Sequence, residues 1–137
     1  MEHVHHMLNW WAILVSAVVL WILGALWFSP AVFAKPWAAI VGRELGQKPK
    51  GVVHGMISSF IGGFLAALVL DHMIVWGHAD GFLHGALIGF IAWLGFIAGV
   101  QYPQRIYEGR PFRYFLIVGG YWFVGLILIG GILAIWR

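Results

Sequence analysis

Residues 55–71, GMISSFIGGFLAALVLD, form an apolar run in which small residues recur every fourth position. At that spacing they share one face of a helix, where the backbone of a neighbouring helix can approach closely. Asp71 ends the row, and a transmembrane helix turns such a carboxylate toward protein rather than lipid. The predicted packing row is Gly55, Ser59, Gly63, Ala67 and Asp71, beside a second row of Ser58, Gly62 and Ala66.

The composition around this run is that of an integral membrane protein. Of 137 residues, 62% are hydrophobic and 9% are charged, whereas a soluble domain is about half apolar and about a quarter charged. The mean hydropathy is +0.90. The chain has no cysteine, which excludes disulfides, thiolate metal sites and cysteine nucleophiles. Its basic residues are not clustered as a nucleic-acid-binding patch requires, so we expect membrane lipids and no nucleic acid as partners.

Four apolar stretches are each long enough to cross a bilayer as a helix. They cover residues 9–28, 52–76, 82–101 and 115–136. Pro30 follows the first stretch, and proline cannot continue the hydrogen-bond ladder of a helix. The polar connector after it is expected to hold a short interfacial helix around residues 37–41, and residues 102–113 are expected to form a loop. The sequence therefore predicts an all-α polytopic membrane protein, a single four-transmembrane-helix bundle over residues 1–137.

The distribution of positive charge predicts the orientation of this bundle. Seven of the eight lysine and arginine residues lie in the first and third connectors. Because cytoplasmic loops carry an excess of these residues, we expect both connectors in the cytoplasm and both termini on the outer, periplasmic side. The membrane would be a bacterial inner membrane. The seven residues are Lys35, Arg43, Lys48, Lys50, Arg105, Arg110 and Arg113.

Glycine spacing predicts close helix packing in the third and fourth spans as well, because helices in lipid associate through small-xxx-small faces. In the fourth span, Gly120 and Gly131 are eleven residues apart, about three helical turns, and so share a face. Some of these faces are expected to pair between subunits, and the first span, poorer in small residues, is expected to lie at the periphery. The further packing positions are Gly81, Gly85, Gly89, Gly95, Gly99, Gly120 and Gly131.

Asp71 and His72 are candidates for an ion or proton path. An apolar turn follows them before Gly77, which places Asp71 about 7 Å inside the outer interface at about 1.5 Å per residue. Ionisable groups at depth are paired or mark such paths, and His54 near the other end of the span is the third candidate. The competing interpretation is that the helix ends near Leu70, so that Asp71 is solvated, and that His54 reaches interfacial water.

The histidines suggest a second kind of site, for zinc or copper on the outer face. Imidazole and carboxylate groups ligate these metals, and His3, His5 and His6 fall on the same predicted side. No tight ligand motif is present, so interfacial histidines tuned by pH are the simpler interpretation. The candidate ligands are His72, His78, Asp80 and His84.

No catalytic motif accompanies these residues. The serines lie in apolar runs or beside proline, without a nucleophile-elbow context, and no phosphate loop, dinucleotide fingerprint or haem-attachment motif is present. We therefore expect no enzymatic activity and predict no cofactor, with a bound lipid or pigment left open.

The overall pattern resembles a family of small four-span membrane proteins, the domain of unknown function 1761. The resemblance covers nearly the full length and implies a shared fold and a membrane location, without an activity or catalytic residues to carry over. The residues that carry it are Asn9-Trp10, GALWFSP at 24–30, FAKPW at 33–37, WLGF at 93–96, YEGRP at 107–111 and Gly120-Tyr121.

Three functions follow as hypotheses. The first is a membrane protein that acts by helix association, as a homo-oligomer or as an accessory subunit of a larger membrane complex. The second is an oligomeric channel or small transporter with Asp71, His72 and His54 on its path. The third is metal binding by the outer histidines.

Overall fold

The computed structural model of the protein describes residues 8–43 and 51–136, and this part of the chain is all-α, without strands. Four of its helices are long and apolar enough to cross a membrane, as the sequence predicts. In chain order the elements are α2 (Trp10–Trp27), α3 (Ala34–Val41), α4 (Val52–Trp76), α5 (Phe82–Ala92), the π-helical η1 (Trp93–Ala98), α6 (Gly99–Tyr107) and α7 (Phe112–Ile135).

The ends of α2 and α3 follow from local sequence. The side chain of Asn9 accepts a hydrogen bond from the backbone N–H of Ala12 and so caps α2, which satisfies a donor that the first turn leaves free. The helix stops at Trp27, before the Ser29-Pro30 pair. The short helix α3 ends at Gly42, whose φ of 76° suits glycine.

The third span is longer than predicted. It continues from Phe82 to Tyr107 through α5, η1 and α6, so the expectation of a loop from residue 102 is wrong. Pro103 lies inside α6 and removes one backbone donor without ending the helix. The guanidinium of Arg105 lies 4.4 Å from the ring centre of Tyr102 and 5.3 Å from that of Phe112, and these contacts stabilise the last turn.

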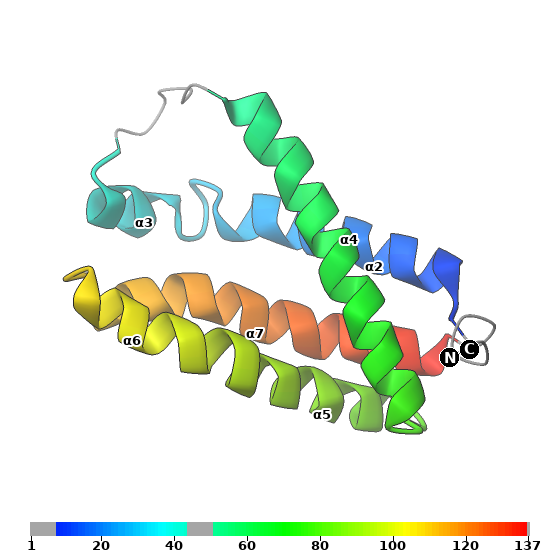
Figure 1. Cartoon of the computed structure of the whole chain (residues 1–137). Coiled ribbons are helices and arrows are strands. Elements are labelled where there is room, and N and C mark those ends of the chain that lie inside the picture. Colours follow the sequence, from blue (N-terminus) through cyan, green and yellow to red (C-terminus); the bar gives the residue numbers. More distant parts are fainter. Residues whose placement is uncertain (1–7, 44–50, 137) are drawn as a thin grey trace.

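The helices form a bundle from which one helix partly departs (Figure 1). The third span and α7 lie side by side, and α2 lies along α7. Helix α4 crosses α2 and packs on the bundle from Phe60 onward, whereas residues 51–59 are all exposed. Of the four spans, α4 is the least buried.

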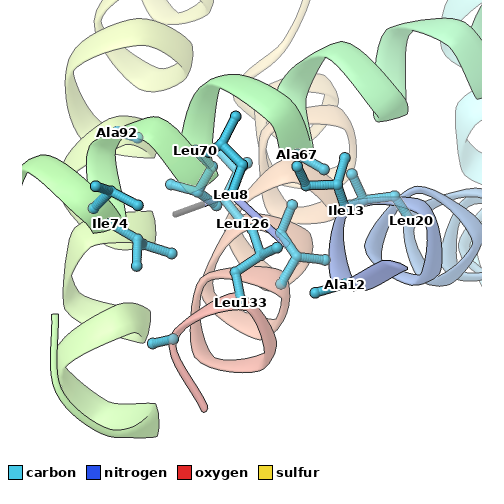
Figure 2. Close-up of a cluster of buried hydrophobic side chains, with 13 residues drawn as sticks. Leu8, Ala12, Ile13, Leu20, Ala67, Leu70, Ile74, Ala92, Leu126 and Leu133 are labelled. Atoms are coloured by element: carbon cyan, nitrogen blue, oxygen red, sulfur yellow. The ribbon is translucent and has the colours of Figure 1, made fainter. Parts of the chain in front are cut away.

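The core lies where α2, α4 and α7 meet (Figure 2). Helix α2 is central rather than peripheral, contrary to the sequence-based expectation, because α4 covers one of its faces and α7 another. Its buried positions are ordinary apolar or small residues and not a glycine row. They are Ala12, Ile13, Ser16, Ala17 and Leu20.

Glycine brings the third span onto α7. A Cβ at Gly85 would collide with the backbone carbonyl of Gly130, and one at Gly89 with the carbonyl of Leu126. A Cβ at Gly131 would collide with the ring of Phe82. This backbone-to-backbone approach is the packing that small-xxx-small spacing permits in a membrane.

Candidate functional site

The departure of α4 from the bundle leaves a cleft between α2, α3 and the N-terminal half of α4. Its volume is about 840 Å³, within the range of small-molecule sites, about 300–1,000 Å³. Trp21 and Met56 in its walls are exposed, so the cleft opens to the side of the bundle. The lining residues used below are Trp21, Gly24, Phe28, Trp37, Arg43, Gly55, Ser59 and Tyr121.

The inner wall of the cleft is held by hydrogen bonds from aromatic side chains to helix carbonyls. The hydroxyl of Tyr121 on α7 donates to the carbonyl of Leu20 at 2.7 Å. Nε1 of Trp27 donates to the carbonyl of Ile117 at 2.8 Å. These bonds join the end of α2 to α7, and because their partners are backbone groups, the wall has a fixed position.

Glycine lets these rings lie flat against the helices. A Cβ at Gly24 would stand 3.3 Å from the hydroxyl oxygen of Tyr121, and one at Gly120 3.3 Å from the ring of Trp27. The ring of Phe28 continues the wall, with its centre 5.8 Å from that of Tyr121 and 5.9 Å from that of Trp37.

The cleft has one charged lining residue, Arg43, which follows α3. Its guanidinium carbon lies 5.9 Å from the ring centre of Trp37, and no carboxylate in the described ranges pairs with it. Deeper in the cleft, the hydroxyl of Ser59 donates to the carbonyl of Gly55 at 2.8 Å. The hydroxyl hydrogen of Ser59 is therefore used within the chain itself.

The predicted packing row of α4 divides between the core and this cleft. Gly63 packs on α2, where a Cβ would stand 3.6 Å from Leu20, and Ala67 is fully buried. Gly55 and Ser59 line the cleft and are exposed, and a Cβ at Gly55 would have no atom within 4 Å. The prediction that these two residues pack against another helix of the chain is therefore wrong, because α4 has already diverged from α2 at Gly55 and Ser59.

Asp71 lies inside α4 and is fully buried. The interpretation that the helix ends near Leu70 and that Asp71 is solvated is therefore wrong, since α4 continues to Trp76. The backbone N–H of Asn9 donates to Oδ2 of Asp71 at 3.3 Å. This contact places the carboxylate at the N-terminal end of α2, where the helix dipole favours negative charge.

The other two residues of the predicted path do not join Asp71. Nδ1 of His72 lies 2.8 Å from the carbonyl oxygen of Leu68, and the ring of His72 lies against that of Trp76. His54 is exposed near the other end of α4, about 25 Å away along the helix at about 1.5 Å per residue.

The candidate metal ligands are likewise not assembled. His78, Asp80 and His84 are exposed, and the backbone N–H of Asp80 donates to Nδ1 of His84 at 3.1 Å. Among residues 8–43 and 51–136, no three side chains of the ligating types come together. The terminal histidines His3, His5 and His6 lie outside the described residues.

Three further glycines of the predicted set have no packing role within the described chain. Gly81 forms the turn before α5 with a φ of 86°, and a Cβ there would meet nothing within 4 Å. Gly95 and Gly99 are exposed. A Cβ at Gly95 would meet nothing, and one at Gly99 only the carbonyl of Leu94 in the same span, at 3.4 Å.

A shallow groove of about 460 Å³ adjoins these exposed glycines. Gly99 lies in the groove, and aromatic rings of Trp93, Tyr102 and Phe115 line it. Nε1 of Trp93 donates to the carbonyl of Gly119 at 2.8 Å, and this bond fixes the wall of the groove.

Sequence reasoning did not single out the cleft residues Arg43, Trp37 and Tyr121 as a site. A signal was present, since three of the segments that carry the family resemblance, residues 24–30, 33–37 and 120–121, all contribute to the cleft. Their convergence depends on tertiary structure and has no counterpart in local spacing.

Residues 11–134 of the chain match the model of a protein family described as "Protein of unknown function (DUF1761)". No curated protein and no solved structure matches the chain.

Proposed function

The chain belongs to the DUF1761 family of proteins of unknown function. We propose that it is a non-enzymatic integral membrane protein that acts by helix association. It would work as a homo-oligomer or as an accessory subunit of a larger membrane complex. The membrane would be a bacterial inner membrane, with the connectors after α2 and α6 in the cytoplasm and both termini on the periplasmic side.

The observation that carries this proposal is the exposed pair Gly95 and Gly99 on the third span. The two glycines are four residues apart and no other helix of the described chain covers them. Glycine in a helix interior destabilises the fold by roughly 0.5–1 kcal/mol relative to alanine, and contact with lipid does not offset this loss of stability. A partner helix would do so, because it can approach a backbone that has no side chains.

The groove beside these glycines supports the same proposal. Its aromatic lining of Trp93, Tyr102 and Phe115 offers a cavity of about 460 Å³ to a bulky side chain of a partner helix. Aromatic side chains of this kind are frequent anchors at protein interfaces. Because the hydrogen bond of Trp93 holds the wall in place, the partner would meet a preformed surface.

The distribution of charge supports the orientation. The described basic residues of the first and third connectors, such as Arg43 and Arg110, follow α3 and α6, whose ends lie opposite the start of α2 (Figure 1). Excess positive charge at one end of a bundle is typical of the cytoplasmic side.

A channel or transporter is the weaker candidate. The burial of Asp71 favours it, because buried acids occur on proton paths. However, Asn9 and the start of α2 give this carboxylate a structural role, and His54 lies at the far end of α4. An outer metal site is weaker still, since the structure does not bring His72, His78, Asp80 and His84 together.

The test of the association proposal replaces Gly95 or Gly99 with leucine and measures the mass of the protein complex in a mild detergent by light scattering. We expect either variant to lower the mass or to release a co-purifying membrane protein. The matched control is Val69→Leu, at an exposed position of α4 outside its rows of small residues, which should leave the mass unchanged. A parent protein that is monomeric and without partners, or variants that assemble like the parent, would refute the proposal.

A further inference from the structure

The cleft between α2, α3 and α4 has the depth of one lipid leaflet. Its lining on α4 runs from Gly51 to Ser59, about 12 Å at about 1.5 Å per residue. The hydrocarbon core of a bilayer is about 30 Å thick, so one leaflet contributes about 15 Å. The end of the cleft with Arg43 and Trp37 corresponds to the membrane interface, where tryptophan and arginine are common. A cleft of this length therefore accommodates an acyl chain that lies parallel to the helices.

The deep part of the cleft requires an apolar occupant. The hydroxyl of Tyr121 is already bonded to the carbonyl of Leu20, and that of Ser59 to the carbonyl of Gly55. Trp21, Phe28 and Met56 contribute apolar surface. A polar molecule would lose its hydrogen bonds to water in this part and find few partners to replace them, whereas an acyl chain has no hydrogen bonds to lose.

The mouth of the cleft offers a positive charge to an anion. Arg43 is the charged residue of the lining, and among the described residues no carboxylate neutralises it. A guanidinium binds phosphate with two parallel hydrogen bonds. The contact of Arg43 with the ring of Trp37 holds the guanidinium at the entrance. Its positive charge is therefore in position before a headgroup binds.

We propose that this cleft binds one phospholipid with an anionic headgroup, with an acyl chain between α2 and the N-terminal half of α4 and the phosphate at Arg43. The site is separate from the association surface on the third span. The lipid would fill the space between α2 and the diverging part of α4. It would supply the van der Waals contacts that a packed helix would otherwise supply there. A transmembrane helix as occupant would need a space about 10–12 Å wide, and an apolar helix would bring no negative charge to Arg43, which no carboxylate of residues 8–43 and 51–136 pairs with.

The test compares lipid retention by native mass spectrometry after purification from nanodiscs that contain equal amounts of phosphatidylglycerol and phosphatidylcholine. We expect the parent to retain one phosphatidylglycerol molecule per chain, with about tenfold preference over phosphatidylcholine, because both lipids offer a phosphate but the choline cation places a second positive charge beside Arg43. Arg43→Gln should remove the preference while lipid is still retained. Gly55→Leu should abolish retention of both lipids, because its side chain occupies the cleft.

Matched controls separate these effects from general damage. Lys35→Gln removes a neighbouring exposed charge of α3 that does not line the cleft, and Gly62→Leu adds the same side chain as Gly55→Leu elsewhere on α4. Both controls should retain phosphatidylglycerol like the parent. A Cβ at Gly55 meets nothing within 4 Å, so the fold of Gly55→Leu is expected to persist.

The proposal is overturned if Gly55→Leu retains lipid like the parent, if the parent retains both lipids equally, or if a polypeptide rather than a lipid is lost from Gly55→Leu. Failure of the association proposal is distinguishable in the same spectra. Gly95→Leu should change the mass of the assembly and leave the lipid count per chain unchanged, whereas Gly55→Leu should do the reverse.

Discussion

The backbone N–H of Asn9 donates a hydrogen bond to Oδ2 of Asp71 at 3.3 Å, across 62 positions of the sequence. The side chain of the same asparagine caps α2 and donates through Nδ2 to the carbonyl of Trp136 at 2.8 Å. Asn9 thus joins the start of α2, the buried acid of α4 and the end of α7. The one acid buried among the described residues therefore has a structural explanation at the junction of three helices.

Replacing Asp71 with asparagine should destabilise the protein by about 1–3 kcal/mol, because a buried charge-assisted contact at the N-terminus of a helix is weakened. Equilibrium unfolding in detergent measures the loss. The matched control is Asp80→Asn, at an exposed carboxylate, which should unfold like the parent. An Asp71→Asn variant as stable as the parent would remove the structural role.

Asn9→Ala should cost about 1 kcal/mol from the lost cap of α2 and more from the lost bond to Trp136. Because the cap fixes the first turn of α2, hydrogen exchange at Ala12 and Ile13 should rise more than exchange in α5. Uniform acceleration in all helices would contradict this local effect.

Gly89→Ala should strongly destabilise the bundle, since its Cβ would collide with the carbonyl of Leu126. Gly95→Ala should stabilise the isolated protein by roughly 0.5–1 kcal/mol, because it fills open space and reduces backbone entropy in the unfolded chain. Thermal unfolding of both variants in the same detergent measures the contrast. Equal melting temperatures would mean that the close approach of α5 to α7 does not persist in the membrane protein.

Tyr121→Phe should destabilise the protein by about 1 kcal/mol, the usual net contribution of one hydrogen bond. The ring would still cover Gly24, so only the bond to the carbonyl of Leu20 is removed. Tyr107→Phe removes a hydroxyl from an exposed ring and serves as the control with no expected change. A loss shared by both variants would indicate a detergent effect instead.

Features that depend on local sequence were predicted well. Hydropathy located the four apolar helices, and the short helix expected around residues 37–41 is α3, which begins three residues earlier, at Ala34. The spacing of Gly85 and Gly89 identified a true packing face, because glycine on one face of a helix in two successive turns lets the backbone of a neighbouring helix approach closely.

Features that depend on tertiary geometry were not predicted. Gly55 and Gly63 occupy equivalent places in the sequence pattern, yet only Gly63 meets α2. The difference comes from the direction of α4 relative to α2, which no four-residue period encodes. The contact between Tyr121 and Leu20 joins residues 101 positions apart, and α2 is central through ordinary residues such as Ala12 and Ile13.

The loop expected from residue 102 shows the opposite error, since α6 continues through Pro103 to Tyr107. Proline usually marks the end of a helix, but the cation–π contacts of Arg105 with Tyr102 and Phe112 keep the last turn intact. The length of the third span was therefore underestimated.

The outward course of α4 also gives the molecule a tapered outline, wider at the C-terminal end of α2 than at its N-terminal end (Figure 1). A tapered body displaces more lipid area from one monolayer than from the other. It therefore couples to the bending of the sheet in which it is embedded, and many copies gathered in one place would favour a curved patch over a flat one.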